Sequence, residues 1–175
     1  MLLNKWGSRQ THVAVKSKGA STAQLEALYR ARFEHFSRVA SGICRDAELG
    51  RDAVQTAFAA AVRARRTFRR RGSLEAWVWR ILVNEARRLA RAHGAERLGA
   101  LTEPSSNGQV GDELGLRAWI AALPERQREA LYLRYYADLD YKAIAEILGI
   151  EVGTVSATLS AAHQALRRRL EEVEQ

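Results

Sequence analysis

The sequence predicts an all-α protein made of two small helical domains that are joined by a flexible linker. Three observations predict this class: apolar residues recur at helical intervals, no segment alternates as a strand does, and one segment rich in Gly, Ser and Pro divides the chain. With 175 residues, 47% of them hydrophobic, both parts can bury a core. We expect a mobile basic tail over 1–20, a three- to four-helix bundle over 21–93, the linker over 94–112 and a helix-turn-helix domain over 113–175.

Capping residues mark the helices of the expected N-terminal bundle. Ser21 and Gln24 form a capping-box pattern, in which each side chain accepts a hydrogen bond from the backbone of the other residue. Asp46 can cap a second helix, and Ser73 follows a break at Gly72 and can cap a third. The expected helices run over about 22–44, 47–67 and 74–92.

The segment "GAERLGALTEPSSNGQVGD", residues 94–112, shows no sustained hydrophobic period and is typical of a linker. Short helical patterns follow it. Pro124 suits the first turn of one helix and Asp140 begins another. The expected helices run over about 113–122, 124–136, 140–148 and 152–173.

The formal net charge of +8 favours a polyanionic partner. This charge is uneven, because residues 1–93 carry the basic excess while residues 113–175 carry slightly more acidic than basic side chains. We therefore expect the N-terminal part to supply most of the attraction to a polyanion.

The stretch "YKAIAEILGIEVGTVSATL" predicts a helix-turn-helix. Ile144 and Leu148 give the first helix an apolar face, Gly149 allows the turn, and Val155 and Leu159 bury the second helix against the first. The second helix of such a motif fits the major groove of DNA. An ordinary pair of antiparallel helices remains the alternative.

The last helix has an outer face without the arginines that usually grip DNA. A helical projection turns five residues inward, namely Val155, Leu159, Ala162, Leu166 and Leu170. The outer residues that can reach bases or backbone are Thr154, Ser156, Thr158, Ser160, His163, Gln164 and Arg167. Hydroxyl and amide groups can bond base edges but do not neutralise phosphates, so this helix is expected to discriminate sequence rather than to supply affinity.

The third helix and the loop before it form a basic surface with aromatic and amide groups. The helix places Arg80, Asn84, Arg87 and Arg91 on one side, and the loop "FRRRGS" precedes it. Trp77 is expected in the core. For Trp79 two alternatives stay open: burial in the core, or stacking on an unpaired base. Because bases can stack on aromatic rings, the combination suits single-stranded nucleic acid better than a duplex.

Two other features favour a protein partner and argue against an enzyme. In "DAVQTAF", Asp52, Gln55 and Thr56 form a mildly polar face that is either a docking surface or an ordinary solvated face.

The four His and Cys44 lack metal-ligand spacing, and no phosphate loop or nucleophile motif occurs. We expect no cofactor, no metal, no small-molecule substrate and no membrane insertion, with Cys44 a buried structural thiol in a cytoplasmic protein.

Three segments together resemble the extracytoplasmic-function (ECF) type of bacterial RNA polymerase sigma factors. They are "DAVQTAF", "GSLEAWVWRILVNEARR" and "LPERQREALYLRYYADLDYKAIAEILGIEVGTVSATL", which occur in the family's order. The resemblance covers 21–93 and 114–173. It implies a factor that binds the polymerase core and directs promoter-specific initiation, under control of an anti-sigma protein.

The resemblance also implies roles for particular residues. One face would bind the clamp helices of the β′ subunit of the polymerase core, which also offers contacts on its β subunit. This face comprises Asp52, Gln55, Thr56 and Phe58. The residues that would recognise and melt the minus-ten element are Phe68, Arg69, Arg70, Arg71, Trp79, Arg80, Asn84, Arg87, Arg88 and Arg91. Those that would read the minus-thirty-five element are Thr154, Ser156, Thr158, Ser160, His163, Gln164 and Arg167.

Some positions depart from the family's pattern. Relatives often carry an acidic residue in place of Thr56, and Lys or Arg in place of Ser156, Thr158 and Ala161. The promoter sequence and the strength of the upstream contact therefore stay open. Two other functions also stay open: an autonomous helix-turn-helix regulator that binds duplex DNA, and a sigma-like adaptor without initiation activity.

Overall fold

The computed structural model describes residues 19–69, 72–100 and 112–173, and every regular element in these ranges is helical. The helices are α1 (Thr22–Cys44), α2 (Ala47–Ala64), the short 3-10 helix η1 (Arg65–Thr67), α3 (Leu74–Ala100), α4 (Asp112–Ala122), α5 (Glu125–Tyr135), α6 (Tyr141–Leu148) and α7 (Val152–Val173). The all-α prediction is confirmed. The expected tail lies almost wholly outside the described residues.

The predicted caps are present. The Ser21 hydroxyl accepts a hydrogen bond from the backbone of Gln24 at 3.1 Å, and the Gln24 side chain accepts one from Ser21 at 2.9 Å. Asp46 accepts from two backbone N–H groups of α2, and Asp140 accepts from one at the start of α6. Gly149 ends α6 with a φ of 67°, a left-handed conformation that glycine adopts without strain.

Three helix limits differ from the prediction. Helix α3 continues to Ala100 instead of ending at residue 92, so the first part of the expected linker is helical. A glycine inside a helix costs only about 1 kcal/mol relative to alanine, and the Ala, Arg, Leu and Glu residues around Gly94 favour helix. The end of the second expected helix is the separate η1, and Pro124 is the N-cap of α5 rather than a first-turn residue.

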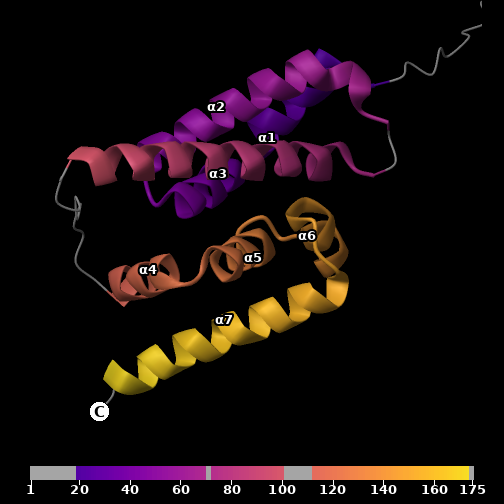
Figure 1. The fold of residues 1–175 in the computed structure, drawn as a ribbon. Helices are drawn as coiled ribbons and strands as arrows, with labels where there is room; N and C mark the ends of the chain where they lie inside the picture. The colour runs from indigo at the N-terminus through magenta and orange to yellow at the C-terminus, as the bar shows by residue number, and fades with distance from the viewer. Residues whose placement is uncertain (1–18, 70–71, 101–111, 174–175) are drawn as a thin grey trace, which may run out of the picture.

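The helices form two regions that pack against each other (Figure 1). Helices α1, α2 and α3 make the N-terminal region, and α4 to α7 make the C-terminal region. Helix α5 contacts α1, and α6 contacts α3, so the apolar residues of both regions join in one cluster. We call the surface between the regions the seam.

Gly42 on α1 lets the two regions approach closely. A Cβ atom built at Gly42 would lie 2.1 Å from Cζ of Tyr132 on α5, and the three atoms nearest to it all belong to that ring. The absence of a side chain at Gly42 therefore makes room for Tyr132. Burial in this position raises the pKa of the Tyr132 phenol.

The inward face of α7 is shorter than the projection predicts. Val155, Leu159 and Ala162 are buried, but Leu166 is only partly buried and Leu170 is 49% exposed. The last turns of α7 thus carry apolar side chains on the surface, and the expectation for Leu170 is wrong.

Within the described ranges, no single helix is long and apolar enough to cross a membrane. Helices α6 and α7 meet the length and composition criteria only as a pair that is bent by 97°. Their main apolar residues, among them Ile144, Val155 and Leu159, are buried in the protein core.

Candidate functional site

A basic cavity with aromatic side chains opens where the loop after η1 meets α3. Its volume is about 380 Å³. The rings of Phe68 and Trp77 lie 5.5 Å apart between centroids, and Arg69 and Arg80 also line the cavity. Flat apolar rings beside cationic groups suit an unstacked base and its phosphate. The predicted loop residues Arg70 and Arg71 lie outside the described residues.

The structure decides between the two alternatives for Trp79 and corrects the expectation for Trp77. Trp79 is completely buried, its ring 4.3 Å from that of Phe36 and its indole N–H donating to Glu75. Stacking of Trp79 on a base is therefore a wrong expectation. Trp77, predicted to be a core residue, is only partly buried and reaches the cavity.

The outer side of α3 presents part of the predicted basic ridge. Arg80 and Asn84 are exposed, on the same helix face as the cavity mouth. Arg88 is exposed too, with its Nε 2.9 Å from a carboxylate oxygen of Glu85. Arg91 lies further along α3, 3.6 Å from Glu125 of α5. At its far end, the ridge thus forms an ion pair with the C-terminal region.

Arg87 is the exception on the ridge, because Glu129 of α5 holds it. Nε and Nη2 of Arg87 donate to the two carboxylate oxygens of Glu129 at 2.5 and 2.6 Å. The Arg87 side chain is 13% exposed and that of Glu129 is fully buried. The side-chain hydrogen bonding to Glu129 raises the pKa of Arg87 above its usual value.

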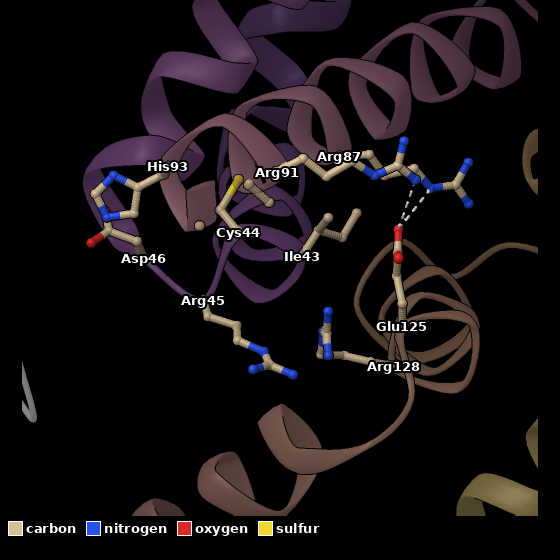
Figure 2. Close-up of a pocket in the computed structure, with 11 residues that line it drawn as sticks. Ile43, Cys44, Arg45, Asp46, Arg87, Arg91, His93, Glu125 and Arg128 are labelled. Atoms are coloured by element: carbon tan, nitrogen blue, oxygen red, sulfur yellow. Dashed lines mark ion pairs between the residues drawn. The ribbon is translucent and has the colours of Figure 1, made fainter. Parts of the chain in front are cut away.

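Other charged groups at the seam surround this pair. Figure 2 shows Arg87 and Arg91 of α3 directed at Glu125. Arg128 is buried and donates Nη1 to the carbonyl of Leu123 at 3.0 Å, which holds the turn before Pro124. Burial, and then the charge of Arg45, lower the pKa of Arg128. The hydrogen bond from Arg128 to Leu123 thus gives the segment "LPERQR", residues 123–128, a structural role at the start of α5.

Cys44 is a buried thiol at the end of α1, as predicted. Its Sγ lies 3.5 Å from the carbonyl oxygen of Ala86, to which it donates. Burial, with a smaller contribution from Asp46, raises the pKa of Cys44 to about 11. The thiol therefore stays protonated at neutral pH.

We expect native Cys44 to react with iodoacetamide at least about 100-fold more slowly at pH 8 than the exposed cysteine of an Arg168→Cys variant, because thiolate is the reactive form and only about one thousandth of Cys44 is ionised. The rate should rise about tenfold per pH unit up to pH 10, following the thiolate fraction. Mass spectrometry of the alkylated peptides measures both rates. Equal rates at pH 8 would contradict the buried environment.

The predicted docking face on α2 is partly exposed. Asp52 and Gln55 are exposed and Thr56 is half-buried. Phe58 differs, because its ring is buried between Tyr29 and Phe36, at 4.9 and 5.2 Å from their centroids. As a direct contact Phe58 is a poor candidate; it lies instead at the floor of an apolar groove between α1 and α2.

The outer face of α7 is available along its length. Thr154, Ser156, Ser160, His163, Gln164 and Arg167 are exposed, and Thr158 is half-buried. The Thr158 hydroxyl donates to the carbonyl of Thr154 at 2.7 Å, and Nε2 of His163 lies 3.0 Å from the Tyr135 hydroxyl. These two contacts fix two of the side chains that the sequence placed on this face.

The sequence did not single out Glu129, Glu146 or Gly42. Glu129 lies among apolar and aromatic residues in the segment "REALYLRYY". An acidic residue in such surroundings indicates a buried ion pair, but the sequence does not show which basic residue is its partner. Glu146 is an exposed residue of α6 that also lines the cavity around Trp77. Among the described residues, no group of three or more His, Cys, Asp and Glu side chains could hold a metal ion.

Comparison with known proteins agrees with this geometry. Residues 28–96 match the family model for sigma-70 region 2, and residues 114–166 match the model for sigma-70 region 4. The chain is 33% identical to the ECF RNA polymerase sigma-E factor of Escherichia coli K12 over an alignment of 161 positions, which covers 80% of this chain and 83% of the relative. The protein belongs to the ECF sigma factors of RNA polymerase. It is thus a non-enzymatic factor that directs transcription initiation.

Other relatives fit the same assignment. The sigma-E factor of Haemophilus influenzae is 29% identical over 139 residues, covering 69% of this chain and 74% of that protein. Among solved structures, the sigma factor RpoE in complex with the anti-sigma factor NepR from Bartonella quintana has a TM-score of 0.71 at 22% identity, covering 85% of this chain and 97% of that one. CnrH in complex with the cytosolic domain of CnrY has a TM-score of 0.69 at 22% identity, covering 87% and 91%.

Proposed function

We propose that this ECF sigma factor divides promoter recognition among three surfaces. The cavity around Trp77 and the ridge of α3 recognise and melt the minus-ten element. The outer face of α7 reads the minus-thirty-five element, and the polar face of α2 docks on the clamp helices of the β′ subunit. The observation that supports this division best is the cavity of α3, where Phe68, Trp77 and Arg80 meet.

The minus-ten surface has the features that melted DNA requires. Stacking on an aromatic ring stabilises an unpaired base by about 1–3 kcal/mol and does not depend strongly on its identity. Trp77 and Phe68 supply the rings, while Arg69 and Arg80 supply charge for the backbone. Asn84 adds an amide that can bond a base edge. The proposed minus-ten residues are therefore Phe68, Arg69, Arg70, Arg71, Trp77, Arg80, Asn84, Arg87, Arg88 and Arg91.

The face of α7 contributes discrimination with little affinity of its own. Ser156, Ser160 and Gln164 are exposed neutral groups that can bond base edges in the major groove. Phosphate contacts depend on cations, and Arg167 is the first arginine along α7. The polymerase core and the N-terminal region supply the remaining binding energy in this proposal.

We expect Asp52→Lys together with Gln55→Lys to weaken binding to the polymerase core by about tenfold or more, because like charges across a protein interface cost several kcal/mol. Both side chains are exposed on α2, so the fold should survive. Surface plasmon resonance against immobilised core measures the effect. Glu171→Lys with Glu172→Gln changes the net charge equally at the far end of α7 and is the control. Unchanged affinity of the α2 variant would exclude this docking face.

Transcription assays separate this function from its alternatives. We expect run-off transcription from a genomic promoter library only when polymerase core and the protein are both present. Specific tight promoter binding without core would favour an autonomous helix-turn-helix regulator, and core binding without transcripts would favour an adaptor. We place the protein in the cytoplasm with the polymerase. An anti-sigma protein is a proposed partner, supported by the structural similarity to a sigma factor bound to NepR.

A further inference from the structure

A second cavity opens at the seam, where the end of α1 faces α3 and the start of α5 (Figure 2). We call it the seam cavity, and Ile43, Arg45, Ala90 and Arg128 lie in its lining. Its volume of about 420 Å³ is in the usual range for small-molecule sites, about 300–1,000 Å³. We propose that the seam cavity binds an organic phosphate of nucleotide type. This ligand is additional to the DNA and polymerase partners of the proposed function.

Both carboxylates in the lining already have partners. Asp46 accepts hydrogen bonds from two backbone N–H groups at the start of α2, at 2.8 and 2.9 Å. Oε1 of Glu125 lies 3.7 Å from Nε of Arg87 and 3.6 Å from Nη2 of Arg91. Within the described ranges, neither acid forms an ion pair with Arg45 or Arg128, the other two arginines of the lining.

Arg45 and Arg128 bring two positive charges to the cavity without a counterion. Nη1 of Arg128 donates to the carbonyls of Ala121 and Leu123, but its buried Nε has no hydrogen-bond partner in the described part of the chain. Figure 2 shows the side chains of Arg45 and Arg128 extending toward each other, and burial, followed by the charge of Arg45, lowers the pKa of Arg128. Like charges at this position repel, and an anion between them would replace the repulsion by two attractions.

The backbone of Arg45 also points to a role for its side chain. Arg45 ends α1 in the left-handed conformation, with a φ of 57°, where glycine is the usual residue. Its backbone N–H donates to the carbonyl of Ser41, a bond that glycine would make equally well. The turn therefore does not require an arginine. Non-glycine residues held in this conformation are concentrated at functional sites.

The remaining lining suits the organic part of such a ligand. Ile43 and Cys44 of α1 and Ala90 of α3 supply apolar surface. Because burial and then Asp46 raise the pKa of Cys44 to about 11, this thiol adds no negative charge at neutral pH. Guanidinium groups bond phosphate oxygens in a planar fork, so the phosphate belongs with Arg45 and Arg128. A base or sugar attached to that phosphate then lies against the apolar side chains.

Isothermal titration calorimetry of the full-length chain with metal-free ATP tests the site. Tripolyphosphate carries the charge without the base, and adenosine carries the base without the charge. Arg45→Gly removes one cation, and its thermal unfolding midpoint should not fall because glycine suits this backbone conformation. Ala90→Leu fills the apolar part of the cavity. Arg38→Gln, which removes the same charge from an exposed position on α1, is the matched control, and Trp77→Ala reports any binding in the minus-ten cavity.

We expect ATP to bind about tenfold more tightly than tripolyphosphate, because the base adds apolar contacts, and adenosine to give no heat of binding. Arg45→Gly should weaken ATP binding about tenfold or more, since hydrogen bonds between ionised groups are lost. Ala90→Leu should weaken ATP binding by a similar factor and leave tripolyphosphate binding nearly unchanged. At about 0.15 M salt, which screens distant charges, Arg38→Gln and Trp77→Ala should change the ATP affinity less than about twofold.

Alkylation of Cys44 locates the ligand without any substitution, because the one cysteine of the chain lies in the lining of the seam cavity. Saturating ATP should slow its reaction with iodoacetamide at about pH 9 by about fivefold or more. Unchanged alkylation, equal affinities for ATP and tripolyphosphate, or equal effects of Arg45→Gly and Arg38→Gln would each overturn the site. Loss of ATP binding in Trp77→Ala would place the nucleotide in the minus-ten cavity and would overturn it as well.

Discussion

Replacing Trp79 with alanine is expected to destabilise the protein by about 3–5 kcal/mol, the range found for deleting a large aromatic side chain from a packed core. Trp79 is fully buried against Phe36, and its indole N–H donates to Glu75 at 3.3 Å. Glu75 also accepts from Nε of Arg32 at 3.0 Å, so the deletion loosens a contact between α1 and α3. Urea denaturation followed by circular dichroism measures the loss of free energy of unfolding.

Trp77→Ala is the matched control, two residues away on the same helix. Because Trp77 is only partly buried, its removal should cost no more than about 1–2 kcal/mol of stability. It should instead reduce promoter melting, since its ring lines the minus-ten cavity. Equal destabilisation by the two substitutions, with no loss of melting for Trp77→Ala, would show that both tryptophans serve the core.

The sequence left Trp79 open and placed Trp77 in the core for a physical reason. Helix α3 contacts α1 and α2 on one side and α6 on another, so apolar residues surround much of its circumference. A projection of the sequence then contains two overlapping stripes. One contains Trp77 and Ile81; the other, which is completely buried, contains Val78, Trp79 and Leu82. Choosing between them requires the position of Phe36, which the periodicity of α3 alone cannot supply.

Local features were predictable, whereas contacts distant in sequence were not. Ser21, Asp46 and Asp140 cap helices within three residues of themselves, so their pattern is visible in the sequence. The partner of Arg87 lies 42 residues away, and Gly42 makes room for a ring in a different region. The basic ridge could therefore be read from the sequence, but the acid that covers one of its arginines required the fold.

The second large effect is expected at the exposed end of the ridge. Arg80→Ala together with Asn84→Ala should reduce open-complex formation by the holoenzyme about 100-fold, because two base or phosphate contacts of about 1–3 kcal/mol each are lost. Both side chains are exposed, so stability should change little. Permanganate footprinting of unpaired thymines measures melting, and a nuclease footprint measures upstream contact.

Arg80 and Asn84 give a cleaner test than Arg87 because the latter also holds Glu129. Alanine at Arg87 would leave a buried carboxylate uncompensated and mix a folding defect with a loss of DNA contact.

The complementary variant is Ser156→Ala with Ser160→Ala on α7, which should weaken the upstream footprint and leave permanganate reactivity at saturating protein unchanged. Normal melting in the Arg80 and Asn84 variant would exclude the α3 ridge as the surface that opens the duplex. In that case the α3 ridge and the α7 face could not be assigned to separate steps, melting and upstream recognition.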